Sequence, residues 1–237
     1  MKADYAVVML GAACVSTVVL AMSDVRSFAK SAAPVEGKNS IEYFVPGDVP
    51  KLTQPNARAC WATAAAMMLQ WQAVKLMIGG NIRFSPEDAA RLADKNRGDT
   101  VETERSFTTL LNEGRGLSDI DKPTFLKSLG LKAEWPANYT VEGWLNLLKT
   151  YGILWVTTEA AQDGQAFVHA QIVTGLVGDG SYSGTFMVFI DPLDGKEHRE
   201  TLVKFISRYE SVIIKDTEAA PDLEPRFQVL HFGHLDR

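Results

Sequence analysis

The pattern of apolar and polar residues changes character near residue 152 of the chain. Before that point, apolar residues recur at helical spacing between recognisable helix start and stop signals. After it, the apolar segments are short and rich in Val, Ile, Phe and Thr, which is typical of strands. Helices gathered in one part and strands in another favour an α+β domain. We therefore predict an N-terminal helical part packed on a C-terminal antiparallel sheet.

The predicted helices have clear boundaries. The longest runs from Cys60 to about Ile78, is apolar nearly all round and is followed by two glycines, so it is expected at the centre of the domain. Ser85 followed by Pro86 and two acidic residues is typical of a helix start, and it leads into Ala89–Ala93. Further helices are predicted at Thr103–Asn112, Lys122–Leu129 and Val141–Tyr151, the last with Thr140 as its N-cap.

The strands are predicted from composition and from the turn residues between them. They are Ile153–Thr158, Val168–Leu176, Thr185–Asp191, Ser211–Lys215 and Phe227–Phe232. The second and third are joined by a short glycine-rich stretch, residues 178–184, and are therefore expected to pair as antiparallel neighbours.

The beginning of the chain differs from the rest. It carries no charge from Tyr5 to Met22, which is long enough to enter a bilayer or to serve as the core of a signal peptide. We predict an export signal or membrane anchor over residues 1–26, with a buried N-terminal helix as the alternative. Residues 27–39, with their alanines, proline and glycine, are predicted to be a linker, and residues 40–237 a single domain.

Composition narrows the range of functions. The chain has 237 residues, 46% of them hydrophobic, which is ample for a core. Its 24 basic and 29 acidic residues form no long runs, so no nucleic-acid partner is expected. The two cysteines, Cys14 and Cys60, do not suggest a disulfide framework, because Cys14 lies in the apolar N-terminal stretch. Neither a metal nor an organic cofactor is expected, since His198, His231 and His234 lack a regular zinc-ligand spacing.

Cys60 has the sequence context of a reactive thiol. An alanine-rich apolar run follows it directly, so Cys60 is expected at the start of a buried helix. The first turn of a helix offers unpaired N–H groups and the positive end of the macrodipole, and both favour thiolate over thiol. A buried structural cysteine is the alternative, because free Cys is among the most buried residue types. The position of Cys60 alone leaves both interpretations open.

Two later residues are candidate partners of the thiol. His169 interrupts an otherwise apolar predicted strand, where an imidazole needs a hydrogen-bond partner. Asp191 ends the next strand, just before Pro192, where a carboxylate can emerge at the edge of the sheet. Antiparallel pairing would bring them together, with the imidazole taking the thiol proton and the carboxylate fixing its tautomer. A satisfied core histidine and a turn aspartate are the alternatives, and Asp194 is a second candidate for the acid.

The order Gln54, Cys60, His169, Asp191, with Trp61 directly after the thiol, resembles the papain-like cysteine proteases. Gln54 lies six residues before Cys60, where papain-like enzymes carry a glutamine. The stretches Ala59–Met68, Tyr151–Val156 and His169–Phe186 are similar to the bacterial branch of secreted papain-like proteases, which includes a plant-pathogen avirulence protease and toxins used between bacteria. One departure is Ile190-Asp191-Pro192-Leu193, which stands where this branch often has Asn-Asp-Pro-Trp.

The resemblance implies a papain-like fold whose long central helix carries the nucleophile. It implies Cys60 as nucleophile, His169 as general base and acid, and Asp191 as the orienting acid. Gln54 and the backbone N–H of Cys60 would then form the oxyanion hole.

The resemblance also implies an exported bacterial enzyme, periplasmic, membrane-anchored or secreted, that acts as an effector or toxin. We expect a protein or peptide substrate and a monomeric catalytic domain. We also expect an inhibitor or immunity protein, and membrane contact only through the N-terminal segment. Two alternatives stay open: a catalytically inactive binding module with the same fold, and an amidase, transglutaminase or deamidase that uses the same residues.

Overall fold

The computed structural model describes residues 40–76, 82–98, 105–162, 164–219 and 228–233. All of them belong to one compact unit that extends from Lys38 to Arg237. The predicted export segment, residues 1–26, and the predicted linker, residues 27–39, lie outside the described residues. Within the described part of the chain, no helix combines the length and apolar character that a membrane span requires.

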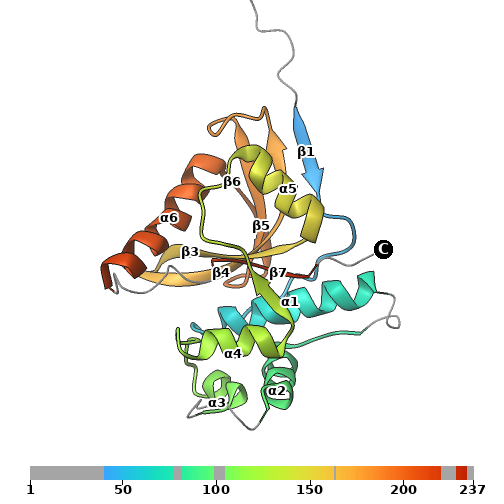
Figure 1. Ribbon diagram of the computed structural model, residues 1–237, viewed down its shortest axis with the longest axis vertical. Helices are drawn as coiled ribbons and strands as arrows, with labels where there is room; N and C mark the ends of the chain where they lie inside the picture. The colour runs from blue at the N-terminus through green and yellow to red at the C-terminus, as the bar shows by residue number, and fades with distance from the viewer. Residues whose placement is uncertain (1–39, 77–81, 99–104, 163, 220–227, 234–237) are drawn as a thin grey trace, which may run out of the picture. The chain divides into compact units, whose positions relative to one another are not determined.

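A seven-stranded antiparallel sheet forms the centre of this unit (Figure 1). Its strands are β1 (Ile41–Phe44), β2 (Leu131–Ala133), β3 (Leu154–Gln162), β4 (Gln165–Gly178), β5 (Thr185–Asp191), β6 (Lys196–Thr201) and β7 (Val229–Phe232). The strand order is β2-β7-β3-β4-β5-β6, and β1 pairs with β4. All pairs are antiparallel, including the predicted pairing of β4 with β5.

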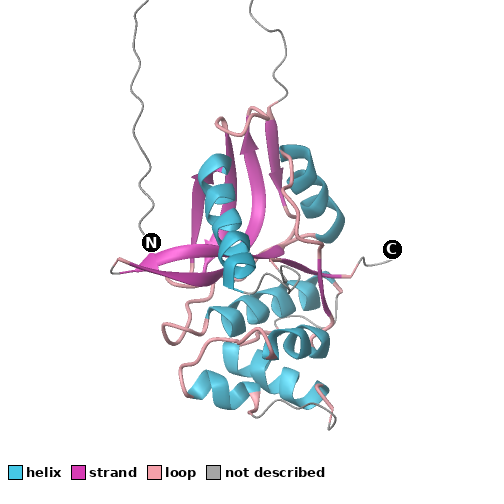
Figure 2. Cartoon of the chain, turned by 60° about the vertical axis from the view of Figure 1, so that its left-hand side comes forward, coloured by secondary structure: helices cyan, strands magenta, loops and turns pink. Residues whose placement is uncertain are grey.

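The helices form two groups around the sheet (Figures 1 and 2). The first four lie together: α1 (Cys60–Lys75), α2 (Pro86–Asn96), α3 (Phe107–Asn112) and α4 (Asp121–Ser128). The other two, α5 (Val141–Tyr151) and α6 (Leu202–Ala219), pack on the sheet itself. The prediction of helices combined with an antiparallel sheet is confirmed.

Two of the predicted helix starts are confirmed by their caps. The Ser85 hydroxyl accepts the N–H of Asp88 at 3.2 Å, and the Asp88 carboxylate accepts the N–H of Ser85 at 3.0 Å, which makes a capping box at the start of α2. Thr140 caps α5 by accepting the N–H of Gly143 at 3.1 Å.

Of the helix predicted over Thr103–Asn112, residues 103 and 104 lie outside the described residues, and α3 begins at Phe107. Ser106 caps it locally, and the Asp94 carboxylate on α2 accepts the N–H groups of Phe107 at 2.7 Å and Thr108 at 2.9 Å. Ser106 is a local start signal that the prediction did not use, whereas the contribution of Asp94 leaves no local sign in the sequence.

The strand predicted over Ser211–Lys215 is wrong, because these residues lie inside α6. Their β-branched side chains favour a strand by composition, but the buried residues of this segment, Leu202, Phe205, Tyr209 and Val212, follow helical spacing. The pattern also missed α6 as a whole and the strands β1, β2 and β6. β6 is almost entirely polar, as exposed edge strands often are, and therefore lacks an apolar signal.

Helix α1 is buried along most of its length. Its residues from Ala62 to Met68 are all buried, and their small alanine side chains let neighbouring elements approach closely. Trp61 fixes the N-terminal end: its Nε1 donates to the carbonyl of Arg115 at 3.1 Å. Its ring packs edge-on against Phe125 of α4, which in turn contacts Trp155 of β3. This row of three aromatic rings joins α1 to the sheet through α4.

Gly152 gives a direct test of this packing. Its φ is +85°, and a Cβ added there would lie 2.0 Å from the Trp71 ring of α1. We expect Gly152→Ala to lower the free energy of unfolding by roughly 3 kcal/mol, because backbone strain and overpacking add together. The measurement is urea unfolding at equilibrium.

Gly130→Ala is the matched control, since Gly130 also has a positive φ of +72° but nothing within 4 Å of the added Cβ. Its expected cost is about 1 kcal/mol, from the backbone alone. Equal destabilisation by the two substitutions would contradict the packing argument.

Candidate functional site

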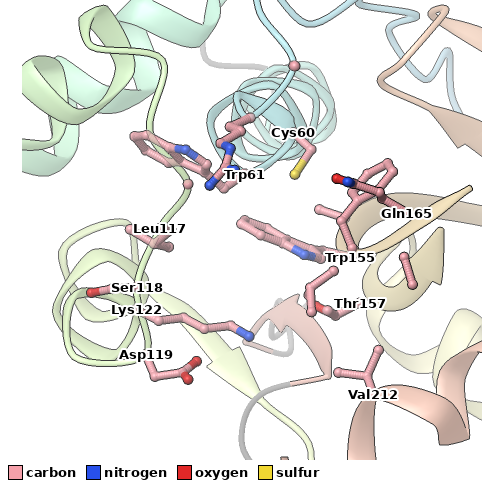
Figure 3. A pocket seen from close by; sticks show the side chains of 17 residues that line it. Cys60, Trp61, Leu117, Ser118, Asp119, Lys122, Trp155, Thr157, Gln165 and Val212 are labelled. Atoms are coloured by element: carbon pink, nitrogen blue, oxygen red, sulfur yellow. The ribbon is translucent and has the colours of Figure 1, made fainter. Parts of the chain in front are cut away.

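A cleft of about 750 Å³ lies between the helical group and the sheet (Figure 3). Cys60 and Trp61 of α1, together with residues 116–119, line one wall, and β3 and β4 line the other. Figure 3 shows the Cys60 sulfur directed into the cleft, with Trp155 and Gln165 on the facing wall. Cys60, whose sequence context predicts a reactive thiol, is thus accessible from the cleft.

Cys60 is the first residue of α1, as predicted, and it carries a free thiol. It is partly exposed, whereas the residues on both sides of it, Ala59 and Trp61, are buried. No side chain among the described residues caps this end of α1. The N–H groups of the first turn and the positive end of the helix dipole therefore act on the sulfur without competition from a cap.

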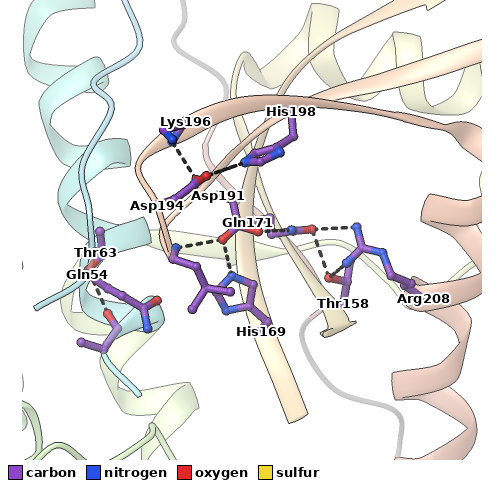
Figure 4. Close-up of polar contacts among 12 residues, drawn as sticks. Gln54, Thr63, Thr158, His169, Gln171, Asp191, Asp194, Lys196, His198 and Arg208 are labelled. Atoms are coloured by element: carbon purple, nitrogen blue, oxygen red, sulfur yellow. Dashed lines mark hydrogen bonds and ion pairs between the residues drawn. The ribbon is translucent and has the colours of Figure 1, made fainter. Parts of the chain in front are cut away.

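The loop before α1 holds Gln54 close to this helix end. Asn56 holds the loop in place. Its side-chain amide donates to the carbonyl of Leu111 at 3.2 Å, and its backbone carbonyl accepts Gln54 Nε2 at 2.8 Å. An amide nitrogen carries two hydrogens, so one N–H of Gln54 remains for another acceptor. Figure 4 shows the Gln54 side chain extending from this loop toward the region beside His169.

His169 and Asp191 are brought together by the pairing of β4 with β5. Ile172 lies opposite Ile190, so Asp191 lies opposite Gln171. His169 comes two residues before Gln171 on β4 and therefore shares its face of the sheet. His169 Nε2 and Asp191 Oδ1 are 2.7 Å apart (Figure 4). The predicted contact between them is confirmed.

Asp194, the second candidate for the acid, does not contact His169. Its carboxylate lies 3.1 Å from Nε2 of His198 instead. Of the two acids considered from the sequence, Asp191 alone is paired with His169 in the described part of the chain.

His169 is 1% exposed, and its environment favours the imidazolium form. Burial by itself lowers the pKa of His169, but hydrogen bonding and charge from Asp191 and from Cys60 outweigh it and raise this pKa from 6.5 to about 9. Because Nε2 is engaged by Asp191, Nδ1 is the nitrogen available to Cys60, and it has no nitrogen or oxygen partner among the described residues. The imidazolium therefore persists through neutral pH and is lost as the pH rises through about 9.

Asp191 is held as a carboxylate by several donors. Its Oδ1 accepts the N–H of Leu193 at 2.9 Å in addition to His169, and its Oδ2 accepts Gln171 Nε2 at 2.8 Å. Burial acts to raise the pKa of Asp191, but the hydrogen bond and charge of His169, helped by Leu193 and Gln171, lower it from 3.8 to about 2. The carboxylate and the imidazolium are thus both charged between about pH 2 and about pH 9.

The turn that carries Asp191 is joined to the loop that carries Gln54. The backbone N–H of Gln54 donates to the carbonyl of Pro192 at 2.7 Å. On the same turn, Gly195 has a φ of +67°, and a Cβ there would lie 2.6 Å from Thr53 Oγ1, so only glycine permits this close approach. The two segments consequently hold one another in position.

We did not predict Gln171 as part of the site from the sequence. Its position could have indicated it, because Gln171 lies two residues after His169, on the same face of a strand that is otherwise largely apolar. A buried polar side chain at this spacing points to a shared hydrogen-bond partner, here Asp191.

The histidines considered for zinc have other partners. His198 stacks on Phe189 and contacts Asp194, whereas His231 contacts Glu134. His234 lies outside the described residues. Where the structure describes the chain, no three His, Cys, Asp or Glu side chains gather in a way that could hold a metal ion.

Chemically, this arrangement places a thiol at a helix start beside an imidazolium that a carboxylate orients. That is the arrangement required for nucleophilic attack by sulfur on a carbonyl carbon. No match is found among curated proteins. The family model described as papain-like cysteine protease AvrRpt2 matches residues 43–210, which is more than half of the chain and includes all of the residues discussed above from Gln54 to Asp191. The chain therefore belongs to this family of papain-like cysteine proteases and is a cysteine peptidase.

Proposed function

We propose that the protein hydrolyses peptide bonds of protein substrates with Cys60 as nucleophile, His169 as general base and acid, and Asp191 as the orienting group. The observation that carries the proposal is the 2.7 Å contact of His169 Nε2 with Asp191, which leaves Nδ1 for the thiol at the start of α1. A histidine that served only the core would be expected to satisfy both nitrogens within the protein.

In the proposed mechanism, the Cys60 thiolate attacks the peptide carbonyl carbon and forms a C–S bond. The carbonyl oxygen becomes an oxyanion, which accepts the Cys60 backbone N–H and the remaining N–H of Gln54. His169 then gives its proton to the leaving amine as the C–N bond breaks. The products of this half-reaction are the free amine and a thioester. His169 next removes a proton from water, whose oxygen forms a bond to the thioester carbon. The C–S bond then breaks, which releases the carboxylic acid and returns Cys60 to the thiolate beside protonated His169.

The substrate is proposed to lie in the cleft beside Cys60. Apolar side chains line both walls of this cleft, Leu117 on one and Phe167 and Val168 on the other. An extended peptide laid between these walls exposes one carbonyl to the start of α1. The cleft excludes bulk water from part of that surface, which strengthens the electrostatic contribution of the oxyanion donors.

Substitution of the three proposed catalytic residues tests the function. We expect Cys60→Ala and His169→Ala to lower kcat/KM for a protein substrate by at least about 10³-fold, because each removes a member of a unit that acts together. Asp191→Ala should cost a smaller factor, since the thiol and imidazole remain. The measurement is steady-state hydrolysis together with labelling of Cys60 by a thiol-directed covalent probe at neutral pH.

Asp194→Ala is the matched control, because Asp194 contacts His198 and not His169. It should leave both hydrolysis and labelling unchanged. A fully active Cys60→Ala protein would end the proposal, and a folded wild-type protein that resists labelling would favour the inactive binding module instead.

The role proposed for Gln54 has its own test. Gln54→Ala should lower kcat by roughly 10²-fold with little change in KM, because the donor is aimed at charge that develops only in the transition state. Gln72→Ala is the control: Gln72 also has a side-chain oxygen without a partner among the described residues, but it lies near the other end of α1. Equal effects of the two substitutions on kcat would argue against an oxyanion role.

We further propose that the protein is exported from a bacterial cell and acts as an effector or toxin on proteins of another cell. Support comes from the uncharged stretch Tyr5–Met22 and from the resemblance to secreted bacterial proteases. We expect the full chain to be recovered in the membrane or exported fraction, and a chain lacking residues 1–30 to stay in the cytoplasm. Identical fractionation of the two chains would contradict a role of this segment in export.

A further inference from the structure

A row of polar contacts continues from Asp191 through Gln171 to Thr158 and Arg208 (Figure 4). Gln171 donates through Nε2 to Asp191 Oδ2 at 2.8 Å, and its Oε1 accepts from Thr158 Oγ1 at 3.1 Å and from Arg208 Nη2 at 3.2 Å. Gln171 is 2% exposed and Thr158 is fully buried, so neither can turn to water for a substitute partner. Loss of any one of these contacts would therefore leave a buried polar group unpaired, which is unfavourable.

The partners of Gln171 decide the orientation of its amide. A guanidinium has only donors, so the side-chain oxygen must face Arg208 and the nitrogen must face Asp191. The amide can therefore only donate to the carboxylate, and it does so from one direction. The positive charge of Arg208 beside the amide oxygen polarises the amide and strengthens this donation.

Arg208 is itself held from several sides. Its guanidinium donates to the Glu200 carboxylate at 2.6 and 3.1 Å, to Thr158 Oγ1 at 2.9 Å and to the carbonyl of Glu159 at 3.1 Å. The rings of Phe189 and Phe205 lie within 5.8 Å of its central carbon. An Arg fixed by α6, β6 and β3 together gives Gln171 an immobile support.

Gln171 completes the fixing of the Asp191 carboxylate. Oδ1 already accepts from His169 and Leu193, but a carboxylate anchored at one oxygen can still turn about its last torsion, which is broad. The bond from Gln171 to Oδ2 removes that freedom. The plane of the carboxylate, and with it the direction in which Oδ1 meets the imidazole, is then set.

We propose that Gln171, oriented by Arg208 and Thr158, is a positioning residue that aligns Asp191 and through it turns Nδ1 of His169 toward Cys60. This inference rests on the proposed protease function. The charges then alternate along the row. The Glu200 carboxylate contacts the Arg208 guanidinium, and the Asp191 carboxylate contacts the His169 imidazolium. The amide of Gln171 bridges Arg208 and Asp191. Cys60, at the start of α1, lies at the end of this row.

Gln171→Leu tests the proposal, because it keeps the approximate size of the side chain and removes the donor. We expect kcat to fall about tenfold, or roughly 1.4 kcal/mol, with little change in KM. In the wild type, the alkaline limb of kcat/KM is expected near pH 9, where His169 loses its proton. In Gln171→Leu this limb should move down toward pH 6.5, because a loosely held Asp191 stabilises the imidazolium less well.

Gln228→Leu is the matched control. Gln228 is 1% exposed, and neither atom of its side-chain amide has a partner among the described residues. It carries the same chemical change at the same burial without contact to Asp191. The alkaline limb should stay where it is in the wild type, whatever the effect on stability.

A second readout does not need turnover. The protonation of His169 is followed by NMR of the imidazole in a Cys60→Ser chain, with and without Gln171→Leu. A lower midpoint in the double variant supports the positioning role even if the protein hydrolyses no peptide, so the failure of the proposed function and the failure of this inference are distinguishable. An unchanged midpoint would show that Gln171 serves stability alone.

Arg208 keeps the test decisive if Gln171→Leu does not fold, since its side chain is 26% exposed and lies at the outer end of the row. Arg208→Met should shift the alkaline limb in the same direction by a smaller amount, and Arg208→Lys, which retains a charged donor, should restore part of the shift. The inference is overturned if the alkaline limb and the His169 midpoint are unchanged in Arg208→Met and in any Gln171 variant that folds.

Discussion

The hydrogen bond between His169 and Asp191 is the interaction on which the rest of the site depends. At 2.7 Å it joins two neighbouring strands, holds an otherwise disfavoured charge on a buried ring, and decides which imidazole nitrogen faces the thiol. It exists because antiparallel pairing of β4 and β5 places both side chains on one face of the sheet. The sheet therefore supplies the imidazole and the carboxylate, while the start of α1 supplies the sulfur.

The surroundings of this bond show how a small domain limits movement at a reactive centre. The Asp191 carboxylate receives donors from its own turn and from its neighbouring strand, and the same turn is bonded to the loop that carries Gln54. A displacement of the acid would move the amide proposed to meet the oxyanion. Orientation of the imidazole and placement of the oxyanion donor are thus linked through the backbone and are not set independently.

Much of this could be predicted from the sequence where the signal was local. The caps Ser85 and Thr140, the strand ending at Asp191 and the thiol at a helix start were all readable, because each depends on residues close in the chain. The segment from β6 to α6 could not be predicted in this way, whereas the strand predicted over Phe227–Phe232 corresponds to β7. β6 has almost no apolar side chains, and the β-branched residues of α6 favoured a strand until the burial of one helical face is known. Gln171 was missed for a related reason: its hydrogen-bond partners, Thr158, Asp191 and Arg208, are distant from it in sequence.

The row of rings from Trp61 through Phe125 to Trp155 has a consequence of another kind. The sulfur belongs to one layer and the imidazole to the other, and these rings help to set the spacing between the layers. Cooperative folding and the ability to react are therefore separable. A chain that kept its helices and strands but relaxed the contact between them would retain its spectroscopic signature of folding, while the sulfur on α1 and the imidazole on β4 moved apart.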